Sequence, residues 1–121
     1  MPGLNIIVAA ADGGRFCAAI ETAIAAAALG QHTRLFLQGD AAAMLRAPAG
    51  FAGDDARRAT GLPRLGELID EALASGVEMV VCQSGLALSD LTADRLVAGV
   101  KAGGVVSFLA AVAAEDRLIV Y

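Results

Sequence analysis

Cys82 is the residue of this chain best placed for chemistry, because it ends an apolar run and small or polar residues follow it at once. The run Val77–Cys82 reads Val-Glu-Met-Val-Val-Cys, a composition typical of a buried parallel strand. Open α/β sheets bind ligands at the carboxyl ends of their strands. Backbone amides at helix starts lower the pKa of a cysteine there, which makes it a nucleophile and a sulfur acceptor. The alternative is a buried, unreactive cysteine at the end of a strand.

The other candidates for chemistry each have a simpler structural interpretation. Cys17, the only other cysteine, falls on the apolar stripe of the first predicted helix, which favours a core residue over a resolving thiol. His32, the single histidine, begins the second predicted strand at the amino end of the sheet, which argues against a Cys–His pair. Asp12 is placed to cap the first helix, and orienting a water molecule or a partner's lysine near the thiol is its alternative role.

Missing motifs and the charge balance exclude several classes of function. The loop Asp12-Gly13-Gly14 lacks the Gly-x-Gly-x-x-Gly fingerprint, so we expect no nucleotide, flavin or other cofactor. No set of His, Cys, Asp and Glu has metal-ligand spacing, so we expect no metal. A net charge of −4 without a basic run argues against nucleic acid as a partner. The weakly polar segment Gly103–Ala114 is short of the ~20 residues that span a bilayer, and no signal peptide is visible, so we expect a cytoplasmic protein with free thiols.

Strand-like and helix-like segments alternate along the chain, which predicts a single α/β domain over residues 1–121. The predicted strands are 4–10, 33–38, 77–82, 96–100 and 118–121. The predicted helices are 14–29, 41–46, 64–75 and 104–114, with a short turn or helix near 89–93. Residues 47–63 are rich in Gly, Pro and charge and are predicted as a surface loop, of the kind that forms lids or is disordered. We expect a flavodoxin-like three-layer sandwich with a five-stranded parallel sheet in the order 2-1-3-4-5.

This strand order predicts which residues surround Cys82. The first and third strands become neighbours, and the carboxyl ends of strands one, three and four meet in one crevice. We therefore expect Cys82 to be the catalytic residue, in a site lined by Asp12, Gly13, Gln83, Ser84 and Gly103.

The composition also predicts self-association. The chain is 57% hydrophobic but only 4% aromatic, so Ala, Leu and Val carry the excess. A domain of 121 residues cannot hide that much apolar surface alone, which favours a homo-oligomer; the alternative is a general bias of the proteome toward alanine.

Three segments resemble those of a known family: Leu-Phe-Leu-Gln-Gly-Asp at 35–40, Gly-Val-Glu-Met-Val-Val-Cys at 76–82, and Asp-Arg-Leu-Ile-Val-Tyr at 116–121. Over essentially its whole length the chain resembles the DsrE/DsrF-like family, which includes the sulfur-relay TusBCD subunits and YchN-like proteins. The resemblance implies a flavodoxin-like sandwich that assembles into trimers or hexamers. It also implies that Cys82 carries a persulfide and passes sulfane sulfur from a protein donor to a protein acceptor.

The segment after the cysteine departs from the sulfur-relay subunits, which typically have an Arg-Gly pair there. The residues Gln83-Ser84-Gly85-Leu86-Ala87-Leu88 contain no arginine and are nearer to the YchN-like branch, which puts a tRNA-thiolation or dissimilatory pathway in doubt. Persulfide carriage is relay chemistry, so the term enzyme applies only loosely. The alternative is a non-catalytic scaffold subunit of the same fold. A thiol peroxidase is a weaker third interpretation, since no Thr-x-x-Cys pocket is present.

Overall fold

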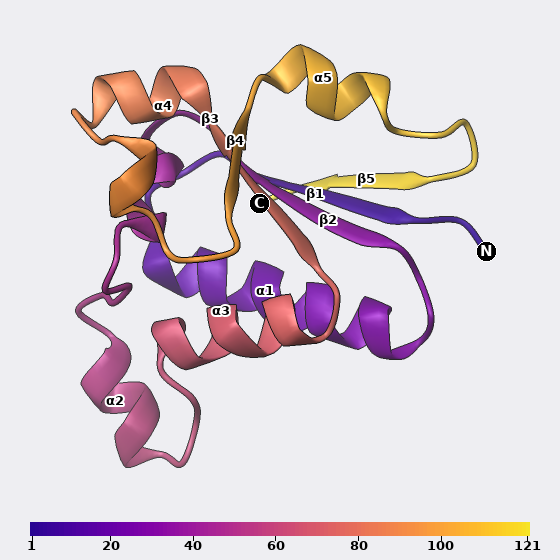
Figure 1. Ribbon diagram of the computed structural model, residues 1–121. Coiled ribbons are helices and arrows are strands. Elements are labelled where there is room, and N and C mark those ends of the chain that lie inside the picture. Colours follow the sequence, from indigo (N-terminus) through magenta and orange to yellow (C-terminus); the bar gives the residue numbers. More distant parts are fainter.

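A five-stranded parallel sheet forms the centre of the computed structural model, which describes residues 1–121 (Figure 1). The strands are β1 (Leu4–Val8), β2 (Thr33–Leu37), β3 (Glu78–Cys82), β4 (Lys101–Gly103) and β5 (Arg117–Val120). The α-helices are α1 (Gly13–Ala28), α2 (Asp54–Ala59), α3 (Leu65–Ala74), α4 (Gln83–Leu88) and α5 (Val105–Ala110), and the 3-10 helices are η1 (Gly39–Leu45) and η2 (Ala93–Arg95). Helices α1 and α3 cover one face of the sheet, and α5 lies over the other (Figure 1). The predicted three-layer α/β sandwich is confirmed.

The strand order corrects the prediction. The sheet runs β4-β3-β2-β1-β5, so β3 pairs with β2 and not with β1 as the order 2-1-3-4-5 required. Right-handed crossovers explain the difference, because helices on the same face carry successive strands in the same direction across a sheet. The helices α1 and α3 pack against each other on one face, so β2 and β3 follow β1 in one direction. The expected order would have placed these two helices on opposite faces.

The two faces of the sheet differ sharply in composition. On the α1/α3 face, one core cluster holds 24 buried residues, including Ile6 and Val8 of β1 and Leu35 and Leu37 of β2. On the α5 face, the buried apolar cluster holds only Ile7, Phe36, Cys82 and Phe108. The reason is the period of two along a strand, which places Asn5, Arg34 and Glu78 on the α5 face between the apolar residues. Most of the hydrophobic stabilisation therefore comes from the α1/α3 face.

Most predicted elements lie within two residues of those observed, but four segments differ. The fourth strand is Lys101–Gly103 and not 96–100, because Leu96 forms an isolated antiparallel bridge with Arg46, and Gly99, at φ +92°, turns the chain before the strand. Helix α4 starts directly after Cys82, ahead of the short turn or helix expected near 89–93, and α5 ends four residues early. The predicted loop 47–63 contains the helix α2.

Side-chain contacts hold the segment around α2 against the α1/α3 side of the molecule. The carboxylate of Asp54 accepts hydrogen bonds from the amides of Phe51 (3.1 Å) and Leu65 (2.8 Å). Arg57 donates to the carbonyl of Pro63 at 2.7 Å and lies 3.7 Å from the carboxylate of Glu21 on α1. The segment is therefore tied to α1 and α3, on the side away from α4 and α5 (Figure 1). None of the helices has the length and apolar character needed to cross a membrane.

Candidate functional site around Cys82

Cys82 lies where β3 ends and α4 begins. Its backbone keeps the extended conformation of the strand (φ −65°, ψ 125°), and the next residue is already helical. The side chain is 7% exposed and belongs to the small cluster under α5, with Ile7, Phe36 and Phe108. The thiol is thus held at the carboxyl end of a central strand, against an apolar wall and next to a helix start.

Two glycines bring a second backbone segment close to the thiol. A Cβ at Gly85, in the first turn of α4, would overlap the carbonyl oxygen of Gly39 and lie 2.7 Å from the Cβ of Ala42. Only a glycine therefore allows α4 to pack directly on η1. Gly39 itself has φ +59°, a left-handed conformation that favours glycine. These two positions place backbone from the end of β2 beside Cys82.

The pKa of the Cys82 thiol is set by two opposing effects. Burial raises the pKa, because a thiolate is poorly solvated in an apolar setting. Hydrogen bonds from the backbone amides of Gly39, Gly85 and Ser84, and from the Ser84 hydroxyl, lower it. The hydrogen bonds outweigh burial, and the pKa lies below its ordinary value. The site therefore stabilises a thiolate with neutral donors and without a cationic side chain.

The structure brings together three of the five residues predicted to line the site. Gln83 and Ser84 form the first turn of α4, directly after Cys82. Gly103 is the register partner of Cys82 in the β3–β4 pair.

Asp12 and Gly13 have other partners. Asp12 follows β1, which β2 separates from β3, and its carboxylate caps α1 by accepting the Arg15 amide at 2.9 Å. A Cβ at Gly13 would overlap the ring of Phe51, so this glycine allows the segment before α2 to pack on α1.

Sequence reasoning missed Gly39. Gly39 directly follows the second predicted strand, 33–38, and the expected order places that strand at the edge of the sheet, away from Cys82. A sheet in which the second and third strands pair brings their carboxyl ends together, so the glycine after the second strand was the available signal.

The predictions for Cys17 and His32 are confirmed. Cys17 is 1% exposed within the main core, and burial raises the pKa of its thiol, an effect that outweighs the lowering influence of Arg57. His32 is exposed at the amino end of β2, where its Nε2 lies 3.2 Å from a carboxylate oxygen of Glu78. Neither residue is placed to assist Cys82.

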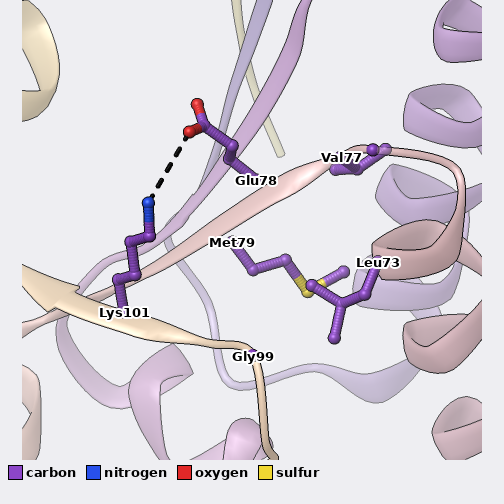
Figure 2. Close-up of a pocket in the computed structure, with 7 residues that line it drawn as sticks. Leu73, Val77, Glu78, Met79, Gly99 and Lys101 are labelled. Atoms are coloured by element: carbon purple, nitrogen blue, oxygen red, sulfur yellow. Dashed lines mark ion pairs between the residues drawn. The ribbon is translucent and has the colours of Figure 1, made fainter.

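The hollow drawn in Figure 2 is lined by few side chains that could take part in a reaction. It lies between the end of α3 and the strands β3 and β4, and it has a volume of about 290 Å³. Leu73 and Met79 form its apolar floor, and the ion pair between Lys101 and Glu78 (3.8 Å) lies at its rim (Figure 2). No group of three or more His, Cys, Asp or Glu side chains is placed to hold a metal ion. The site around Cys82 therefore remains the candidate for chemistry.

Comparisons with known proteins support the resemblance drawn from the residues. The sequence profile of the DsrE/DsrF-like family matches residues 7–121. Among solved structures, the ychN protein from E. coli is similar with a TM-score of 0.78 and 21% sequence identity. The protein of unknown function MTH1491 from Methanobacterium thermoautotrophicum is similar with a TM-score of 0.72 and 16% identity. Both similarities cover 100% of this chain and 100% of the other. No curated protein matches.

Proposed function

The chain belongs to the DsrE/DsrF-like family, which is associated with sulfur relay, and we propose that it carries sulfane sulfur as a persulfide on Cys82. One observation carries the proposal: backbone amides from two separate segments converge on this thiol and lower its pKa. The thiolate is the form of cysteine that attacks sulfur. Cys17 shows the contrast, because no hydrogen-bond donor lowers the pKa of its thiol and burial raises it.

The proposed cycle has two sulfur transfers. In the first, the Cys82 thiolate attacks the outer sulfur of a donor persulfide, forms Cys82–S–SH and releases the donor as a thiolate. In the second, an acceptor thiolate attacks the outer sulfur of Cys82–S–SH, the S–S bond breaks, and Cys82 leaves as a thiolate. Donor and acceptor are protein thiols, and no electrons are gained or lost overall. The amides of Gly39, Ser84 and Gly85 stabilise the charge on the Cys82 sulfur whenever it is a thiolate.

We further propose that the protein works as a homo-oligomer, a trimer or a hexamer, in the cytoplasm. Strand β5 is an open edge of the sheet with all four of its residues exposed, and α5 lies on the adjoining face. Open edges and exposed apolar side chains favour contact with another chain. The exposed large apolar residues of these two elements are Val106, Leu109, Leu118, Ile119 and Val120. Both cysteines are free thiols, which suits a reducing compartment.

Intact-mass measurement after incubation with a low-molecular-weight persulfide tests the carrier function. We expect the wild type to gain the mass of one or more sulfur atoms and to lose it again in DTT. Cys82→Ser should gain nothing, whereas the matched control Cys17→Ser should load like the wild type. Circular dichroism of both variants would show that the fold is kept. Loading of Cys82→Ser, or no loading of the wild type, would contradict the proposal, and the second result would favour a scaffold subunit.

A further inference from the structure

A small pocket lies on the α5 face of the sheet, beside the strand that ends at Cys82. Its volume is about 220 Å³, several times the ~30 Å³ that one water molecule occupies in the liquid. Its lining includes two cationic side chains, a hydroxyl, an aromatic ring and the backbone of two glycines: Arg34, Lys101, Ser107, Phe108, Gly103 and Gly104. No acidic side chain lines it. The proposed sulfur transfer does not use this pocket.

Arg34 is a buried cation without a carboxylate partner. The residue is 8% exposed, and none of the three ion pairs in the structure involves it. Its Nε donates to Oδ1 of Asn5 at 2.8 Å, and its Nη2 donates to the carbonyl of Phe108 at 2.9 Å. The other guanidinium nitrogen, Nη1, makes no hydrogen bond to the protein, and it is not fully buried. Buried charges are normally paired, and no protein acceptor takes up the remaining donors of Arg34, so an anion in the pocket would supply the pairing that the protein does not.

The guanidinium group is held rigidly. Its central carbon lies 4.2 Å from the centre of the Phe108 ring, in a cation–π contact. Asn5, which is 2% exposed, accepts from Arg34 and in turn donates to the Arg117 carbonyl at 3.3 Å. The carboxylate of Asp116 accepts hydrogen bonds from Nδ2 of Asn5 and from two backbone amides. Asn5 therefore separates this carboxylate from the guanidinium group, and no direct ion pair forms. The fork of donors is therefore pre-organised before any ligand arrives.

Lys101 supplies a second positive charge that is free to move. Its Nζ lies 3.8 Å from a carboxylate oxygen of Glu78, and the two side chains are 73% and 42% exposed. Figure 2 shows both on the side of the strands opposite to Leu73 and Met79. Exposed ion pairs of this kind contribute little to stability, so turning Lys101 toward a ligand costs little.

We propose that this pocket binds a small tetrahedral oxyanion of the phosphate, sulfate or thiosulfate type. The free donors of Arg34 contact two of its oxygens, an arrangement that suits the planar fork of a guanidinium. Lys101 adds the second charge, and the Ser107 hydroxyl is available as a further donor. This site is distinct from Cys82, and oxyanion binding here does not depend on sulfur transfer at Cys82.

The experiment is a titration of the full chain with phosphate in Tris–chloride buffer, with sodium chloride at matched ionic strength as the reference. Amide NMR signals of Gly103 and Gly104 report on the pocket. We expect saturable shifts with phosphate and none with chloride. Arg34→Lys should weaken binding at least about tenfold, because it keeps the charge and loses the fork. A parallel titration with thiosulfate decides whether phosphorus or sulfur oxyanions bind better.

Substitutions of exposed residues still test the proposal if Arg34→Lys fails to fold. Lys101→Gln should weaken phosphate binding severalfold, whereas Arg58→Gln, an exposed arginine on α2, should leave it unchanged. Shifts that are linear and equal in chloride, or equal affinities for Lys101→Gln and the wild type, would overturn the proposal. It would also be overturned if no shift occurred and Arg34→Lys altered the sedimentation coefficient, since a carboxylate of a second copy would then occupy the pocket.

Discussion

Gly85→Ala tests whether the packing of α4 on η1 sets the reactivity of Cys82. The added methyl group would overlap the Gly39 carbonyl oxygen and lie 2.7 Å from the Cβ of Ala42. Carbon atoms in van der Waals contact lie ~3.5–4.0 Å apart, so the two segments must separate by roughly 1 Å. The nearest obstacle is backbone, so no flexible side chain can move aside instead. We expect α4 to shift and the amides of Gly39 and Gly85 to move away from the thiol.

The shift has two measurable consequences. Overpacking of this kind costs about 1–3 kcal/mol, which for a chain of this length lowers Tm by roughly 4–12 °C. A hydrogen bond to a charged group is worth about 1.5–3 kcal/mol, so loss of one amide lowers the thiolate population about tenfold or more. Below the pKa of the thiol, the rate of Cys82 alkylation by iodoacetamide should fall by the same factor, and its pH profile should move to higher pH.

Gly104→Ala is the matched control, because a Cβ at Gly104 meets no atom within 4 Å. It should leave both Tm and the alkylation profile close to those of the wild type. Cys17 is buried and has a raised pKa, so alkylation of folded protein reports on Cys82. If Gly85→Ala lowered Tm but left the alkylation profile unchanged, the amides would not be what stabilises the thiolate, and the reasoning would be refuted.

Three further perturbations have expected outcomes. Ser84→Ala removes one hydroxyl donor from Cys82 and should raise the pKa of the thiol and slow alkylation severalfold, with Tm nearly unchanged. Val106→Asp places a charge on the most exposed large apolar residue of α5, and analytical ultracentrifugation should find smaller assemblies; an unchanged sedimentation coefficient would move the interface elsewhere. Hydrogen bonds from the amides of Gly3 and Ala113 hold the pKa of Asp116 below its ordinary value. Its stabilisation is therefore present above the unfolded pKa of ~3.9 and is lost as the pH falls below it, so Asp116→Asn should lower Tm at pH 6 more than at pH 3.

The elements of the fold could be predicted from the sequence, but not their order. Apolar, β-branched runs and Gly-terminated helices identified the strands within two residues, apart from β4, whose three residues carry no apolar pattern. Strand order depends on which face each crossover helix covers. The sequence of a helix shows that it has an apolar stripe, but not which face of the sheet the stripe packs against. The stripes of α1 and α3 are equally compatible with packing on opposite faces. Only their mutual packing, visible in the structure, decides the matter.

The same limit explains the outcome for the site. Cys82, Gln83 and Ser84 are adjacent in sequence, so their proximity needed no knowledge of the order, and Gly103 depended only on pairing of the third and fourth strands. Asp12 and Gly39 each lie shortly after a strand, and the sequence alone does not show which of the two is the neighbour of the thiol. The pairing of β3 with β2 places Gly39 there and leaves Asp12 to cap α1.

The α5 face of the sheet links these observations. Its central strands alternate polar residues with apolar ones, an arrangement that weakens the packing of α5 and leaves only four buried residues in the cluster beneath it. The α1/α3 face carries 24 and supplies the stability that allows this. Because few apolar side chains pack there, this face can hold groups that close packing would exclude: a thiol with a lowered pKa at the end of β3, and an arginine without a carboxylate partner near the start of β2. The division of the sheet into a packing face and a polar face is therefore the feature from which both proposed sites follow.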